Sequence, residues 1–342
     1  MIDSWIKRKI GLSEADDLIR KRLEDYQLFR LRKTLAHAKK NSIFYRELYE
    51  KIDIEKDIKN LNDIKEIPFL TPDDLKENGN KMICVPQSNI SRIVTLDTSG
   101  STGKPKRVYF TENDQELTKD YFNYGLRVMT NTDDVFMILL PCTAPGSVGD
   151  LVRIGLERNG VKVISYGFPS SDQSQDREII NIMKQQGVTS LVGTASSVTR
   201  LSEKSKINQG NRDIVIRTVL LSAEYVSTEN VADISENWNC EVFEHYGMTE
   251  TGLGGAMACE SHEGYHPREA DLLFEIIDPK SGEVLPEGEY GEIVFTTLTR
   301  EGMPLIRYRT GDVSRWIFES CPCGSILNRL DRVGDRKVRK NL

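Results

Sequence analysis

A nine-residue stretch rich in glycine, hydroxyl and lysine side chains is the segment of this sequence best suited to chemistry. It comprises Thr98, Ser99, Gly100, Ser101, Thr102, Gly103, Lys104, Pro105 and Lys106. Apolar residues precede it at 93–96 and follow it at 108–110, so we predict a glycine-rich turn between two strands. Glycine lets backbone N–H groups approach an anion, while hydroxyls and lysines add donors and positive charge. The stretch therefore predicts a polyphosphate-binding loop.

Two other interpretations of this loop are less favoured. A Walker A loop requires Ser or Thr after its lysine, and here Pro105 follows Lys104. A solvated Ser/Gly hairpin loop has no need of lysine at both 104 and 106. The chain also lacks the G-x-S-x-G pattern, so a serine-hydrolase reaction has no motif to support it.

Two further motifs follow in order, and together with the loop they indicate a family. They are Tyr246-Gly247-Met248-Thr249-Glu250 and Tyr308-Arg309-Thr310-Gly311-Asp312. Taken alone, the Thr-Glu pair would be a helix cap and the Gly-Asp pair a turn. With the loop, the three motifs resemble those of the AMP-forming adenylating enzymes, the acyl-CoA synthetase superfamily. Residues 246–324, including the run at 291–297 and Cys321-Pro322-Cys323-Gly324, most resemble the phenylacetate–CoA ligase branch.

The resemblance implies an activity. Members of this family use ATP to convert a carboxylic acid to an acyl-adenylate with release of pyrophosphate, and then transfer the acyl group to CoA. Phenylacetate or a similar aryl or acyl acid is the substrate that the branch suggests. Because two anions must meet in such a reaction, charge neutralisation and positioning dominate its catalysis.

The resemblance also implies the site residues. The loop 98–106, with Lys106 at its end, would hold the β- and γ-phosphates. Thr249 would bond the α-phosphate and Glu250 would hold Mg²⁺, since an acid beside a triphosphate needs a bridging cation. The adenine would be lined by Ser222, Ala223, Glu224, Tyr246, Gly247 and Met248. Asp312 would bind the ribose. The family also uses an arginine near the hinge to contact the ribose or a phosphate. Arg329, Arg332 and Arg336 are the candidates for this role. Alignment with the family motif favours Arg336, although Asp335 stands where the family has glycine.

Cys321 and Cys323 suggest a metal knuckle, because cysteines two apart can both reach one ion. Cys259 and either His262 or His266 could complete a Cys₃His zinc set, which is a common structural site. The resemblance favours His266. The closed ligand set predicts a structural zinc, and free thiols are the alternative.

Composition restricts the class of protein. The chain has 342 residues, with 38% hydrophobic and 29% charged residues and a formal net charge of −6, as in soluble globular proteins. This charge gives no support to nucleic-acid binding. Six cysteines do not suggest a disulfide scaffold. The longest apolar run is too short to span a bilayer, and charges occupy the N-terminus where a signal peptide needs an apolar core. We therefore expect a cytoplasmic protein with no membrane partner, for which a homodimer would fit the relatives.

Apolar periodicity predicts an α/β fold. We expect a helix over 13–40 with Ser13 and Asp16 as its cap, a helix starting at Thr71, and another starting at Thr111. Strands and helices then alternate from 135 to 237, which indicates a mainly parallel sheet. Strand patterns from 270 onward predict a smaller antiparallel β unit.

The expected domains follow from these elements. We expect an N-terminal helical segment at 1–75, an α/β adenylation core at 76–269, an antiparallel β subdomain at 270–328 and a hinge or tail at 329–342. Family members continue into a C-terminal lid domain, and this sequence stops at Leu342. The alternatives to a full ligase are therefore a lidless domain that binds nucleotide or acyl-adenylate, and an enzyme that passes its acyl group to a protein thiol.

Overall fold

The structure is a computed structural model that describes residues 2–13, 15–96, 105–207 and 214–334. The predicted phosphate-loop residues 98–104 and Arg336 lie outside this part of the chain. The chain divides into two compact units. The first unit contains Thr118–Met248 and Ala256–Tyr265; the second contains Ile2–Leu117, Thr249–Gly255 and His266–Leu342. The domain boundaries expected from the sequence fall at other residues and stay a prediction.

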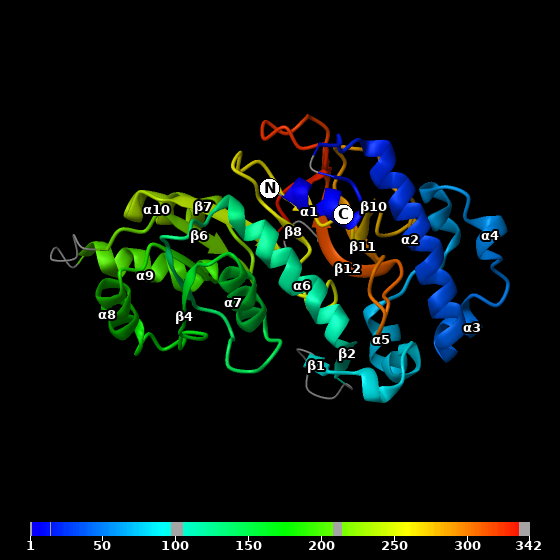
Figure 1. The fold of residues 1–342 in the computed structure, drawn as a ribbon, viewed down its shortest axis with the longest axis horizontal. Helices are drawn as coiled ribbons and strands as arrows, with labels where there is room; N and C mark the ends of the chain where they lie inside the picture. The colour runs from blue at the N-terminus through cyan, green and yellow to red at the C-terminus, as the bar shows by residue number, and fades with distance from the viewer. Residues whose placement is uncertain (1, 14, 97–104, 208–213, 335–342) are drawn as a thin grey trace. The chain divides into compact units, whose positions relative to one another are not determined.

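The first unit is built on a mainly parallel sheet (Figure 1). Its strands are β3 (Val135–Ile138), β4 (Lys162–Ser165), β5 (Ser190–Gly193), β6 (Thr218–Leu221), β7 (Glu241–Tyr246) and β8 (Ala256–Met257). They lie in the order β4-β3-β5-β6-β7-β8, in which the first five are parallel and β8 is antiparallel to β7. The mixed α/β class with a parallel-dominated sheet is confirmed.

Helices connect these strands at the positions that the sequence pattern predicts. They are α7 (Val148–Arg158), α8 (Asp176–Gln186), α9 (Ala195–Ile207) and α10 (Thr228–Trp238), with a short 3₁₀ helix η4 (Leu126–Val128) before β3. Strands β5 and β6 are buried throughout, because helices cover parallel sheets and their strands read as continuous apolar runs. Ser227 begins α10 with a capping box in which its Oγ accepts from the Asn230 N–H at 3.1 Å.

The second unit contains short antiparallel sheets. Strands β10 (Leu272–Ile277), β11 (Gly291–Thr297) and β12 (Tyr308–Ser314) form one sheet in that order. Two hairpins are formed by β1 (Arg92–Leu96) with β2 (Lys106–Phe110), and by β13 (Trp316–Ile317) with β14 (Arg329–Leu330). A two-residue strand, β9 (His266–Pro267), precedes β10. The expected antiparallel β unit is therefore present, and the motif that contains Asp312 is its strand β12.

Helices of the second unit come mostly from its N-terminal part. They are α1 (Ile2–Lys9), α2 (Arg20–Asn41), α3 (Ile43–Leu48), α4 (Ile54–Asp57) and α5 (Pro72–Asn78), with 3₁₀ helices η1 (Leu61–Glu66), η2 (Gly79–Met82) and η3 (Gln87–Asn89). Helix α6 (Glu112–Gly125) is divided between the two units after Leu117. No helix within the described ranges is both long and apolar enough to cross a membrane.

The helix predicted over 13–40 begins later than the sequence pattern indicated. Ser13 and Asp16 do bond each other, with the Ser13 N–H and Oγ 2.8 and 2.7 Å from the Asp16 carboxylate. They close a separate turn, because Ile19 is extended, with φ −113° and ψ 148°, and α2 starts at Arg20. The start at Thr71 is confirmed: its Oγ accepts from the Asp74 N–H, and Pro72 is the first helical residue.

Candidate active site

In the first unit, the predicted adenine-binding residues follow neighbouring strands of the parallel sheet. Ser222, Ala223 and Glu224 follow β6, whereas Gly247 and Met248 follow β7. Because β6 and β7 are parallel and hydrogen-bonded, both segments lie at the same edge. Ligands of open α/β sheets bind at this edge, outside the carboxyl ends of the strands. The structure therefore places these predicted residues where a nucleotide would be expected.

Glu224 joins the end of β6 to the residues that follow β5. Its carboxylate accepts hydrogen bonds from the Ser196 backbone N–H and, at 3.2 Å, from the Ser196 Oγ. Ser196 lies in the first turn of α9, where a negative charge is stabilised by the helix dipole. The preceding Ala223 has φ +71°, a left-handed conformation that a non-glycine residue seldom adopts. Backbone strain of this kind is a recurring property of binding loops.

Sequence reasoning missed His245, which lies directly before Tyr246 at the end of β7. Its Nδ1 is 2.9 Å from the Ser222 Oγ, and both residues are buried. Its ring packs against Phe122, with 5.6 Å between ring centroids, and against Tyr121 at 6.2 Å. His245 thus ties β7 to the end of β6 beneath the predicted adenine edge. Its position directly before the Tyr246 motif was the signal that the sequence offered.

In the second unit, two predicted catalytic residues form an ion pair. The Lys106 Nζ is 2.7 Å from Glu250 Oε1, and Glu250 is only 2% exposed. The Tyr308 hydroxyl donates to the same oxygen at 3.1 Å. Among the described residues, the Lys106 ammonium and the Tyr308 hydroxyl thus both donate to the same oxygen of this carboxylate, Oε1. Glu250 Oε2 therefore receives neither of these hydrogen bonds.

Tyr308 is held as a hydrogen-bond donor. Burial, and then the charge of Glu250, raise the pKa of Tyr308 far above its ordinary value, so the phenol stays protonated at neutral pH. Asp312 lies on the same strand and adds to this effect. The Asp312 N–H donates to the Thr310 Oγ at 2.9 Å, which fixes the backbone of the predicted ribose ligand. Thr249 directly precedes Glu250, and its carbonyl accepts from the Gly252 N–H.

A cysteine and histidine group also lies in the second unit. His266, Cys321 and Cys323 bring their ligand atoms within 4.8 Å of one another, and His266 Nε2 is 3.4 Å from the Cys323 Sγ. His266 Nδ1 is 3.2 Å from the Asn328 carbonyl oxygen. Since a carbonyl can only accept, Nδ1 carries the proton and Nε2 offers a lone pair, as in metal-binding histidines. The other predicted ligand, Cys259, belongs to the first unit, where its Sγ is 2.9 Å from the Ser261 Oγ. His262, the alternative to His266, packs against Phe243 in the first unit, with the two rings tilted by 56°.

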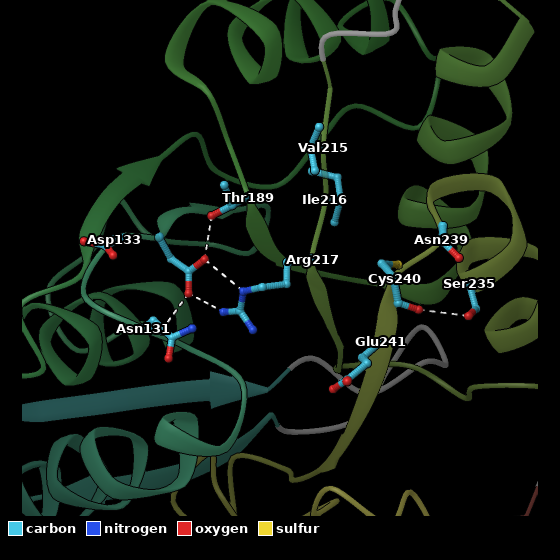
Figure 2. A pocket seen from close by; sticks show the side chains of 11 residues that line it. Asn131, Asp133, Thr189, Val215, Ile216, Arg217, Ser235, Asn239, Cys240 and Glu241 are labelled. Atoms are coloured by element: carbon cyan, nitrogen blue, oxygen red, sulfur yellow. Dashed lines mark hydrogen bonds and ion pairs between the residues drawn. The ribbon is translucent and has the colours of Figure 1, made fainter.

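A pocket of about 960 Å³ in the first unit lies away from all the predicted site residues. It is found at the amino ends of β5, β6 and β7 and is lined by Thr189, Arg217 and Glu241, among others (Figure 2). The Asp134 carboxylate at its side accepts from the Asn131 N–H, the Thr189 hydroxyl and the Arg217 guanidinium. This network joins the starts of three strands, which is a structural role.

Comparison with known proteins identifies the family. The family model for AMP-binding enzymes matches residues 24–298. A phenylacetate–coenzyme A ligase of Thermus thermophilus is 29% identical over 315 residues, covering 91% of this chain and 69% of that protein. A phenylacetate–coenzyme A ligase of Pseudomonas putida is 31% identical over 299 residues, covering 86% of this chain and 66% of that protein. The chain thus spans about two thirds of the length of these ligases.

A solved structure supports the fold. The structure of a 2-hydroxyisobutyryl-CoA ligase in complex with 2-HIB-AMP and CoA has a TM-score of 0.82 and 21% identity. The superposition covers 94% of this chain and 73% of that protein. The resemblance of three motifs to AMP-forming ligases is therefore confirmed over most of the chain: it belongs to the AMP-binding enzyme family and is similar to its phenylacetate–CoA ligases.

Proposed function

We propose that this chain activates a carboxylic acid with ATP, forming an acyl-adenylate and pyrophosphate, and that it transfers the acyl group to CoA. The observation that carries the proposal is the Lys106–Glu250 ion pair. It joins the end of the predicted phosphate loop to the acid of the Tyr246 motif, residues 144 positions apart in the sequence. A triphosphate with bound Mg²⁺ needs a positive side chain for its phosphate oxygens and a carboxylate for the metal ion, and Lys106 and Glu250 bring these two groups together.

Mg²⁺ fits the residues at this place. Glu250 would be its protein ligand, because Mg²⁺ prefers carboxylate oxygens and keeps several waters and phosphate oxygens. The ion would neutralise charge on the departing pyrophosphate. Lys106 would bind a phosphate oxygen, and Thr249 would donate to the α-phosphate. Tyr308 would keep the Glu250 carboxylate oriented, and Asp312 would accept from the ribose hydroxyls.

In the first unit, the edge formed by residues 222–224 and 246–248 would bind the adenine. The relatives suggest phenylacetate or a similar aryl acid. We propose that the acid contacts Tyr124, Pro141 and residues 193–197, which come from α6 and from the carboxyl ends of β3 and β5. One changed apolar contact alters such a preference by only about 1–3 kcal/mol.

A structural zinc ion is part of the proposal. His266, Cys321 and Cys323 supply suitable ligand atoms, and the tautomer of His266 puts its lone pair on Nε2, the atom that faces the Cys323 Sγ. Cys259 remains the predicted fourth ligand. Such an ion would stabilise the fold and take no part in the reaction.

The experiment that tests the function is ATP–pyrophosphate exchange with a panel of carboxylates headed by phenylacetate. Carboxylate-dependent exchange is expected, and CoA-dependent AMP release should follow. Nucleotide binding without exchange would favour a domain that only holds nucleotide or acyl-adenylate. Exchange without CoA-dependent AMP release would favour transfer to a protein thiol. A cytoplasmic location and a homodimer remain predictions.

A further inference from the structure

Arg300 lies in the connection between β11 and β12 of the second unit, and its backbone is held firmly. The N–H groups of Glu301 and Gly302 donate to the two oxygens of Asp114, at 2.9 and 3.1 Å. Thr111 N–H also donates to Asp114, at 3.0 Å. This anchoring fixes the point from which the Arg300 side chain extends.

The Arg300 side chain is buried, and the described residues leave one of its donors without a hydrogen bond. The residue is 7% exposed, and its guanidinium lies over the Phe110 ring, 5.1 Å from the centroid. Within the described residues, its Nη1 has no hydrogen-bond partner, and no carboxylate lies within ion-pair distance. Arg307 in the same unit is different: it is paired with Glu275 at 2.8 Å and also donates to two backbone carbonyls.

The two acids whose charges act on Arg300 are already hydrogen-bonded to other groups. Asp114 is occupied by the backbone of Glu301 and Gly302, and Glu250 is occupied by Lys106 and Tyr308. Burial lowers the pKa of Arg300 to about 10, although the charges of Asp114 and Glu250 raise it. Arg300 is therefore still a cation at neutral pH. A buried cation with an unpaired donor lowers the stability of a fold, so we expect Arg300 to be retained for a reason other than stability.

We propose that Arg300 is a preset binding group for a phosphate oxygen of ATP, an inference that rests on the proposed function. Phe110, which the guanidinium covers, ends the strand β2 that begins at Lys106. Glu250, the predicted Mg²⁺ ligand, is one of the acids whose charge raises the pKa of Arg300. A cation that is desolvated in advance binds an anion without further reorganisation, which is how enzymes stabilise developing charge. Arginine is suited to the task because its planar donors match phosphate geometry.

The test compares Arg300→Met with Arg307→Met by calorimetry and thermal unfolding. Three probes are titrated with Mg²⁺ present: ATP, pyrophosphate and AMP. Arg300→Met is expected to weaken ATP binding at least about tenfold, the size of one charge-assisted hydrogen bond, and to leave the melting temperature unchanged or higher. Weakened pyrophosphate binding would assign the contact to the β- or γ-phosphate. Weakened AMP binding would assign it to the α-phosphate.

Arg307→Met is the matched control, since it removes a buried arginine that is fully paired. It should lower the melting temperature because Glu275 loses its partner. Arg300→Lys keeps the charge at a nearly unchanged volume, and it should fold normally and lose less affinity than Arg300→Met. If both Arg300 variants bind ATP with wild-type affinity, the proposed role of Arg300 is wrong, and the proposed function of the chain is unaffected. A wild-type chain that binds none of the three probes would overturn the proposed function as well.

Discussion

The Tyr308 hydroxyl and the Lys106 ammonium share one oxygen of Glu250, so that Tyr308 fixes the plane of a carboxylate whose second oxygen receives neither of these hydrogen bonds. Tyr308 and Glu250 are 58 positions apart and belong to two different motifs. The hydrogen bond between them joins the two motifs within the second unit.

Tyr308→Phe tests this relationship. The change removes one donor to a buried carboxylate, and we expect a loss of about 1–2 kcal/mol in the free energy of unfolding. ATP–pyrophosphate exchange should require a higher Mg²⁺ concentration, because Glu250 loses an orienting contact. Tyr290→Phe is the control, since its hydroxyl bonds Asp331 at an exposed position. An unchanged Mg²⁺ dependence in Tyr308→Phe would show that this hydrogen bond does not orient Glu250 for the metal ion.

Glu250→Gln tests the metal ligand. The amide keeps the shape of the side chain but removes the negative charge, so we expect exchange to fall at least about 100-fold. Glu157→Gln on α7, which weakens an exposed ion pair with Arg153, is the control and should retain full exchange. Circular dichroism should show that both variants fold. Normal exchange in Glu250→Gln would remove this residue from the metal site.

Cys321→Ser tests the proposed zinc site. Removal of one thiolate should release zinc, measured by elemental analysis, and lower the melting temperature. Cys240→Ser is the control because Cys240 is a buried thiol in the first unit, with burial raising its pKa to about 12. It should leave the metal content unchanged. A wild-type protein that contains no zinc would contradict the proposal.

Acid sensitivity of the first unit should depend on Asp134. Burial raises the pKa of Asp134, but Arg217, the Asn131 N–H and Thr189 together bring it below its ordinary value of 3.8. A carboxylate with a lowered pKa stabilises the fold above its unfolded pKa, and this stability is lost as pH falls through the folded value. The free energy of unfolding should therefore decrease below about pH 4.

Asp134→Asn is expected to remove this part of the pH dependence. It should also cost about 1–3 kcal/mol at pH 7, because Arg217 loses its charged partner (Figure 2). Chemical denaturation of both proteins at pH 7 and at pH 3.5 measures the difference. Equal losses of stability on acidification in the two proteins would show that another group carries the acid sensitivity.

Local patterns predicted the fold well where a single segment determines its own structure. Apolar runs at four-residue strands such as β5 and β6 and the capping residues Thr71 and Ser227 were sufficient to place elements. The start of α2 was misplaced because the Ser13–Asp16 turn has the sequence of a helix cap. Residues 17–19, which end with the extended Ile19, separate this turn from α2.

Contacts between distant segments could not be predicted. Nothing in the sequence near Arg300 indicates that its Nη1 has no hydrogen-bond partner among the described residues. The pairing of His245 with Ser222 depends on which strands are neighbours. The family resemblance supplied roles for Glu250 and Asp312. It did not supply the shared oxygen that joins Lys106, Glu250 and Tyr308.

The anchoring of the Arg300 segment has an evolutionary consequence. A Cβ atom at Gly302 would lie 2.6 Å from the Asp114 carboxylate that binds its N–H. Asp114 is itself fixed by Thr111 and Glu301, so it has no room to withdraw. Substitutions at Asp114 and Gly302 should therefore be coupled during evolution. A larger residue at 302 requires a compensating change at 114. That change would remove the hydrogen bonds that hold the backbone next to Arg300.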